Sequence, residues 1–230
     1  MRKITICLIF ISFLISCQSN KTKKNKINDF EKSFKEEKGE GFTEYLDSTT
    51  NIYSNFKYHV AIDAPDNWKT DAGVSEHTIF RTYQPDSSLT FSINVIELKF
   101  GENEKKSTID IWEFYQNHKE QMDYPFTTLI EEQLKTKVND FNCQHSYIKN
   151  NSCLKRKFNY KIRDLENEYS LTIISYQTYI RGFTYTFTLN IPTIFYNEKP
   201  GYYDAFFRNV YFLKDRERLD EILNQVNKKS

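Results

Sequence analysis

Residues 169–191 read YSLTIISYQTYIRGFTYTFTLNI. Two apolar and aromatic runs, Tyr169 to Ile180 and Phe183 to Ile191, flank the dipeptide Arg181-Gly182. β-Branched and aromatic residues favour strands, and glycine accepts the positive φ that a tight turn requires. The stretch therefore predicts a long β-hairpin at the centre of a sheet.

Shorter segments elsewhere in the chain repeat this strand pattern. Apolar and polar residues alternate from Phe56 to Ile62 and from Leu89 to Phe100, which is the period of a strand with one buried face. Further strands are expected at residues 77–83, 126–134, 142–148, 154–162 and 210–213. An antiparallel sheet of about six to eight strands would accommodate these segments.

Three segments have helical patterns. Ser107 is a plausible N-cap for a helix that runs to Met122, with Ile109 and Trp112 on its packing face. A loop and a short aromatic helix are expected over residues 192–207, and an amphipathic helix over residues 214–229. The order of strands and helices predicts an α+β fold, in which helices flank the antiparallel sheet.

The first seventeen residues predict a lipoprotein signal. Arg2 and Lys3 precede an apolar run, Ile4 to Ile15, that is too short to span a bilayer comfortably. The tetrad that ends at Cys17, Leu-Ile-Ser-Cys, resembles the lipobox of bacterial lipoproteins, in which the cysteine carries lipid. Several acyl chains on one residue anchor a protein stably. An ordinary secretion signal or an uncleaved anchor is the alternative.

These features divide the chain into a signal peptide at residues 1–16, a polar tether at 17–50 and a folded domain at 51–230. The tether is rich in lysine and glutamate and cannot bury enough apolar surface to fold by itself. Removal of the signal changes the balance from 32 basic and 31 acidic residues to 30 and 31. Without a basic stripe, nucleic acid is not an expected partner.

The sequence contains no motif for a catalytic centre, a metal or a cofactor. Four histidines, at positions 59, 77, 118 and 145, lack the spacing of metal ligands, and the six glycines form no phosphate-binding loop. Cys143 and His145 alternate on one predicted strand, yet no orienting residue accompanies them. We therefore expect no catalytic residue, no metal and no cofactor.

Two cysteines remain in the predicted domain. Cys7 leaves with the signal and Cys17 would carry lipid, which leaves Cys143 and Cys153. Such a pair in an exported protein indicates a disulfide, but a hairpin turn at residues 149–151 would place the two out of direct opposition. A disulfide and two unpaired thiols both stay open.

Aromatic residues crowd the predicted short helix beyond what one buried face needs. Tyrosines that remain exposed offer a large contact area at little cost in rotamer entropy. The candidate binding surface therefore contains Tyr196, Tyr202, Tyr203 and Phe206. Core packing of these side chains is the alternative.

The order of elements resembles the PsbP-like superfamily. The resemblance rests on Pro65-Asp-Asn-Trp68 after the first strand, on the order of strands and helices, and on the closing segment Asn209 to Leu213. That superfamily includes an extrinsic photosystem protein, a nuclear Ran-binding protein and many small bacterial lipoproteins. The resemblance implies an α-β-α sandwich that binds proteins and has no shared catalytic centre. Because fold alone does not give function, no functional residue carries over.

Together the patterns predict a membrane-tethered lipoprotein of the bacterial envelope that binds or assembles with an envelope protein. Gln-Ser-Asn-Lys follows Cys17, without the acidic cluster associated with surface display, which favours the periplasmic face. The outer membrane is the expected location, and the inner membrane stays open. The alternatives are an envelope hydrolase whose site forms only in the fold, and a carrier of a small ligand.

Overall fold

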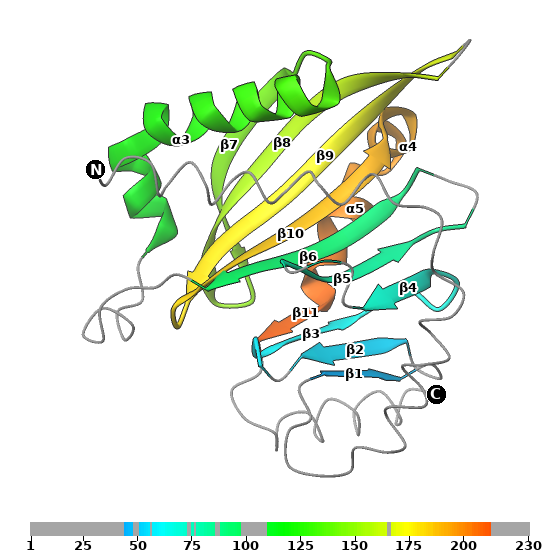
Figure 1. Ribbon diagram of the computed structural model, residues 1–230, viewed down its shortest axis with the longest axis vertical. Coiled ribbons are helices and arrows are strands. Elements are labelled where there is room, and N and C mark those ends of the chain that lie inside the picture. The colour runs from blue at the N-terminus through cyan, green and yellow to red at the C-terminus, as the bar shows by residue number, and fades with distance from the viewer. Residues whose placement is uncertain are drawn as a thin grey trace.

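The computed structural model of the chain describes residues 44–47, 51–55, 57–72, 75, 77–85, 88–97, 110–164 and 167–212. These residues form two antiparallel sheets, with helices packed on the larger one (Figure 1). The prediction of an α+β fold, with an antiparallel sheet flanked by helices, is confirmed. The predicted signal, most of the tether and the helix expected at 214–229 lie outside the described residues.

The larger sheet contains seven strands in the order β4-β5-β6-β10-β9-β8-β7. Their bounds are β4 Lys69–Ala72, β5 Thr78–Tyr83, β6 Thr90–Glu97, β7 Asn139–Ile148, β8 Asn151–Asp164, β9 Asn167–Ile180 and β10 Phe183–Pro192. The long hairpin predicted from the sequence is β9–β10, in which Ile180 pairs with Phe183. Arg181 and Gly182 form its turn with φ of 53° and 87°, and Gly182 adopts this conformation easily because it has no Cβ.

The smaller sheet has the order β1-β2-β3-β11. Its strands are β1 Glu44–Asp47, β2 Ile52–Asn55, β3 Val60–Asp63 and β11 Val210–Phe212. The single strand predicted from Phe56 to Ile62 is wrong, because a turn at residues 57–59, with His59 at φ 51°, separates β2 from β3. β1 also lies within the range assigned to the tether, so the folded part begins before residue 51.

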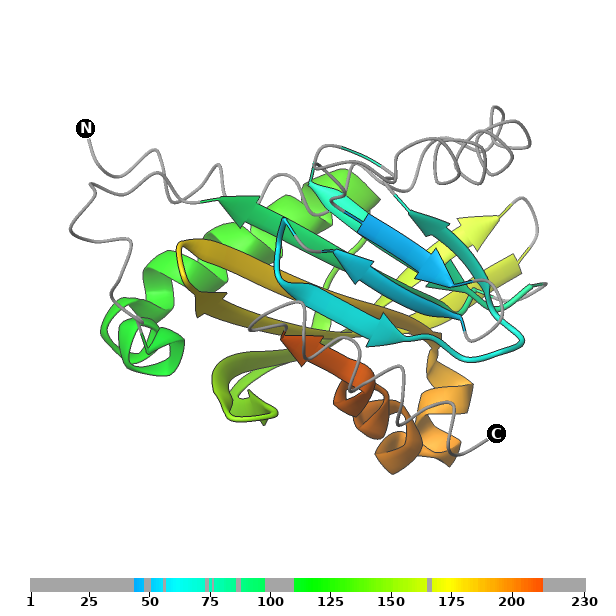
Figure 2. The same cartoon turned by 90° about the horizontal axis from the view of Figure 1, so that it is seen from below.

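The main core lies between the two sheets. It joins apolar side chains of β2, β3 and β11 to those of β5, β6, β9 and β10, and its fully buried aromatic residues are Tyr53, Phe80, Phe91, Tyr185 and Phe187. Figure 2 shows the smaller sheet layered against the larger one, with the long helix on the far side. The alternation of apolar residues along these strands is what places one face of each sheet in this core.

The long helix α3, Ile111–Leu134, covers the opposite face of the large sheet over β8 and β9. Asp110 caps it by accepting hydrogen bonds from the backbone N–H groups of Trp112 and Glu113. The helix is kinked at His118 (φ −134°) and continues through Pro125. The strand predicted at residues 126–134 is therefore wrong, because Phe126 and Ile130 pack as helical residues on the sheet.

The chain after β10 forms two short helices and one turn of 3-10 helix. They are α4 Thr193–Glu198, α5 Pro200–Phe206 and η2 Phe207–Asn209, and α4 rests on β9 and β10. The short aromatic helix predicted here is thus two helices, broken at Lys199 (φ −141°) ahead of Pro200. Among the described helices, none is long and apolar enough to cross a membrane.

Candidate binding surface

The four aromatic residues predicted as a binding surface take different positions on α4 and α5. Tyr196 and Phe206 are core residues with 7% and 6% of their surface exposed. Phe206 stacks on Trp68, with 5.3 Å between ring centroids, and lies 4.9 Å from the ring of Phe91. Tyr203 is half-buried against Tyr196 and Tyr202.

Tyr202 is the residue of this predicted set that reaches solvent, with 63% of its surface exposed. Two residues of α4 outside the predicted set are also exposed, namely Ile194 at 65% and Phe195 at 41%, whereas Tyr202 lies on α5. We call Ile194, Phe195 and Tyr202 the α4–α5 patch. Exposed large apolar side chains elsewhere in the described residues include Tyr124, Tyr147 and Tyr169, which lie on other elements.

Local sequence explains why these side chains face outwards. In a helix of this length one side holds the residues about one turn apart, and α4 turns Tyr196 towards the core. Ile194 and Phe195, two and one positions earlier, are then turned towards solvent. Pro200 starts α5 at its first position, where the missing N–H costs nothing.

Polar contacts with β8 and β9 hold the two helices in place. The Lys155 ammonium group forms an ion pair with the Asp204 carboxylate at 2.8 Å, and the ammonium of Lys157 lies 4.6 Å from the ring centre of Tyr196. Burial alone would lower the pKa of Lys155, but the contact with Asp204 outweighs it and raises that pKa. The lysine therefore stays charged at neutral pH, although its side chain is only 12% exposed.

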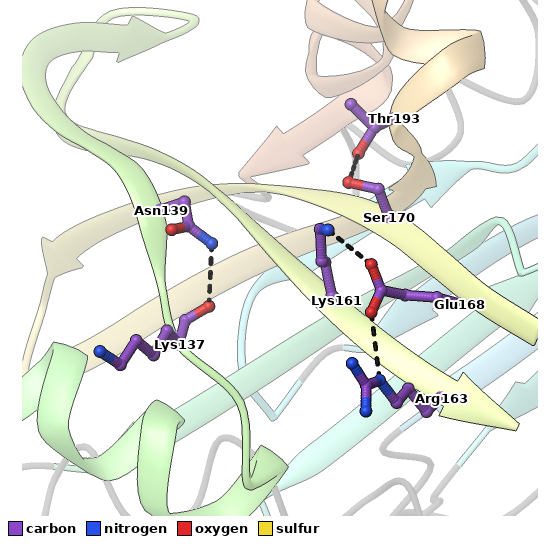
Figure 3. Close-up of polar contacts among 7 residues, drawn as sticks. All are labelled: Lys137, Asn139, Lys161, Arg163, Glu168, Ser170 and Thr193. Atoms are coloured by element: carbon purple, nitrogen blue, oxygen red, sulfur yellow. Dashed lines mark hydrogen bonds and ion pairs between the residues drawn. The ribbon is translucent and has the colours of Figure 1, made fainter.

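The start of α4 is joined to the β8–β9 hairpin beside a charged group (Figure 3). The Thr193 hydroxyl donates to Ser170 Oγ at 3.0 Å. Nearby, Glu168 accepts from Lys161 at 2.5 Å and from Arg163 at 3.1 Å, and these two bonds keep the pKa of the Glu168 carboxyl low. The Thr193–Ser170 hydrogen bond thus ties the first residue of α4 to β9.

A second group of polar side chains lies between α3 and the large sheet. The Tyr115 hydroxyl donates to Asp123 at 2.5 Å, and the buried Arg156 donates to Gln177 at 2.7 Å. Burial raises the pKa of the neighbouring Cys143 thiol, in spite of the lowering effects of Arg156 and Tyr115. A thiol that stays protonated is a poor nucleophile, so this cluster favours a structural role.

His145 lies beside this cluster in a contact that orients α3. Its ring stacks on Trp112 at 5.2 Å, and its Nε2 lies 3.0 Å from Ser152 Oγ. The Ser152 hydroxyl donates its single proton to Asp110 at 2.9 Å, so His145 donates to Ser152 and does not act as its base. The arrangement fastens the start of α3 to β7 and β8, and does not activate a nucleophile.

The two domain cysteines are free thiols on opposite faces of the sheet. Cys153 belongs to the core between the sheets, whereas Cys143 packs under α3. In the register of β7 and β8, Cys143 pairs with Arg156 and Cys153 with Ser146, so the two side chains point apart. The disulfide that the sequence left open is therefore corrected to two unpaired thiols, and burial raises the pKa of Cys153 to about 12.

The histidines are spread over different elements. His59 lies in the β2–β3 turn, His77 before β5, His118 at the kink of α3 and His145 on β7. Within the part of the chain that the structure describes, no group of three or more His, Cys, Asp and Glu side chains could hold a metal ion.

Comparisons with known proteins give only distant likeness. No family model and no curated protein sequence matches the chain. The solution structure of cyanobacterial PsbP (CyanoP) from Synechocystis is 14% identical, with a TM-score of 0.48 over 76% of this chain and 95% of that chain. A crystal structure from Bacteroides thetaiotaomicron is 12% identical, with a TM-score of 0.40 over 68% of this chain and 46% of the other. At these values neither structure informs the function of this chain.

Proposed function

We propose that this chain is a lipid-anchored, non-catalytic module of the bacterial envelope that binds a partner protein through the α4–α5 patch. The observation that carries the proposal is that two consecutive short helices expose three large apolar side chains, Ile194, Phe195 and Tyr202. Grouped exposed apolar residues mark contact sites more often than single ones do. Aromatic anchors are also the residues that dominate binding energy at protein interfaces.

The support beneath the patch favours binding without rearrangement. The ion pair between Lys155 and Asp204, and the packing of Tyr196 and Phe206 in the core, hold both helices against the sheet. A surface that is already ordered loses little conformational entropy when a partner binds. The patch therefore has the rigidity expected of a preformed docking site.

The anchor part of the proposal rests on the sequence around Cys17. Its lipobox-like tetrad and charged, apolar leader support lipid attachment at Cys17. The residues after Cys17 favour the periplasmic face, and the outer membrane is the location proposed. In this proposal the membrane is contacted through lipid, and an envelope protein is the partner.

Affinity capture from detergent-solubilised envelopes tests the binding role. Wild-type protein should recover a stoichiometric partner, and a variant with Ile194→Ser, Phe195→Ser and Tyr202→Ser should lose it. Tyr124→Ser is the matched control, because Tyr124 is 73% exposed on α3 and outside the patch. Recovery of no stoichiometric partner, or equal loss with the control, would contradict the proposal.

The anchor is tested separately by Cys17→Ala. This variant should take up no labelled fatty acid and should fractionate with soluble periplasmic proteins. A Cys17→Ala protein that still incorporates label would show that the lipobox interpretation is wrong.

A further inference from the structure

The edges of the two sheets differ sharply in length and charge. Among the described strands, the edge strands are β1, β11, β4 and β7. The first three have four, three and four residues, and β1 and β4 carry charged side chains such as Glu44, Lys69 and Asp71. Short or charged edges resist pairing with another chain. β7 has ten residues and is the long edge of the molecule's described part.

β7 has little of the usual protection against pairing. A register shift between Asn139 and Asn142 interrupts its first residues, where Asp140 has a φ of 53°. The following residues, 142–148, contain no charged residue, no proline and no glycine. Asn142 and Gln144 are exposed, and Tyr147 is 61% exposed. Such an uncharged, extended edge is open to an added strand.

The turn after β7 determines which backbone groups are free. Ile148 pairs with Asn151 across a two-residue turn, and such a turn closes on a hydrogen-bonded pair. Hydrogen-bonded and non-hydrogen-bonded pairs alternate along antiparallel strands. Gln144 therefore directs its backbone groups towards β8, while Cys143 and His145 direct theirs to the open edge.

We propose that β7 pairs with β7 of a second copy of this chain, antiparallel and centred on Gln144, so that the two large sheets become continuous. A two-fold axis perpendicular to the sheet keeps the same face of both copies on the same side. Residues opposite each other must then share a face. Centring on Gln144 places Asn142 opposite Ser146, and lets Cys143 and His145 exchange backbone hydrogen bonds.

The sequence of β7 favours a second copy of this chain as the partner strand. Two-fold pairing sets the segment against its own sequence, and an uncharged segment meets no like-charge repulsion from itself. The side chains of Asn142, Gln144 and Ser146 both donate and accept hydrogen bonds, so they match in this register. The pairing uses the long free edge of both copies and therefore closes at a dimer.

Cysteine cross-linking in the envelope tests the register. The full-length protein carries Cys143→Ser, to remove the nearest native thiol, together with Gln144→Cys. In the proposed register residue 144 faces its own copy across the two-fold axis as a non-hydrogen-bonded pair, and the two residues of such a pair lie close together. Mild oxidation should therefore join the two introduced cysteines and give a covalent dimer. Asn142→Cys and Ser146→Cys should give little dimer singly and should cross-link when combined in one chain.

Gln116→Cys on the exposed face of α3 is the matched control, and it should give no dimer. A Gln144→Cys protein that dimerises no more than this control overturns the proposal. An equal amount of dimer from the single Asn142→Cys variant overturns it as well.

A second measurement avoids the thiols. Gln144→Lys places two ammonium groups across the axis and should shift the detergent-solubilised protein from dimer to monomer, whereas Gln116→Lys should not. A monomeric mass for the detergent-solubilised wild-type protein also overturns the proposal.

Discussion

Truncation of Phe206 and of Phe195 separates core from surface on adjacent helices. Phe206 is buried and packs on Trp68 and Phe91, so Phe206→Ala removes a buried ring and leaves a cavity. Such changes cost about 3 to 5 kcal/mol, and we expect about 4 kcal/mol here. Phe195 is 41% exposed, so Phe195→Ala should cost within about 1 kcal/mol and should act on partner binding.

Equilibrium unfolding in urea, followed by tryptophan fluorescence and far-UV circular dichroism, measures both effects. For a domain with a denaturant slope of about 2 kcal/mol per molar, Phe206→Ala should lower the midpoint by about 2 M. Trp68 stacks on Phe206, so the native fluorescence should also change. A loss below about 1.5 kcal/mol for Phe206→Ala, or equal losses for both variants, would refute the division into core and patch.

Three further predictions concern the contacts beneath the helices. Asp204→Ala leaves the charged Lys155 without its carboxylate partner and should lower the free energy of unfolding by about 2 kcal/mol at pH 7. Lys155→Met should restore part of this loss in a double-mutant cycle. Because the pair raises the Lys155 pKa, its contribution is present below the ordinary pKa of 10.5 and is lost as the pH rises through the raised value. Iodoacetamide at pH 8 should modify Cys143 faster than Cys153, and dithiothreitol should leave the unfolding midpoint unchanged. Asp110→Ala should cost about 1 to 2 kcal/mol at pH 7. Burial opposes the lowered Asp110 pKa, but bonds from Ser152 and the backbone prevail, so this contribution fades in unfolding experiments as the pH falls below 3.8.

Local sequence was sufficient for the strands whose pattern is unambiguous. The β9–β10 hairpin follows from its apolar alternation and from Arg181-Gly182, which are properties of adjacent residues. β6 follows in the same way, from strict alternation beginning at Leu89. These elements needed no knowledge of what lies above or below the sheet.

Tertiary packing decided the elements that the sequence missed. The sequence predicted a helix that ends at Met122 and a strand from residue 126, yet α3 continues through Pro125 and buries Phe126 and Ile130 on the sheet. The division between β2 and β3 depends on His59 in a positive-φ conformation that histidine adopts only occasionally. Neither outcome is encoded by periodicity alone.

The candidate site shows the same limit. Aromatic density directed attention to the region of α4 and α5, but it did not indicate which side chains face the solvent. Tyr196 and Phe206 were predicted as part of the surface and are buried, whereas Ile194 and Phe195 are exposed. Helical spacing could have separated the buried from the exposed residues, because in a short helix one buried residue determines which way its neighbours face.

Strand β8 explains why the position of the patch depends on charge as well as on apolar packing. On one face Phe158 packs under α3, and on the other Lys155 and Lys157 hold α5 and α4. The sequence showed the first face as apolar and the second as polar, which suggests solvent. Long lysine side chains can instead cover apolar surface with their methylene groups while the ammonium reaches a carboxylate or a ring. Since Asp204 is a third exposed, salt weakens its pairing with Lys155 only in part, so the α4–α5 patch should keep its orientation at physiological ionic strength.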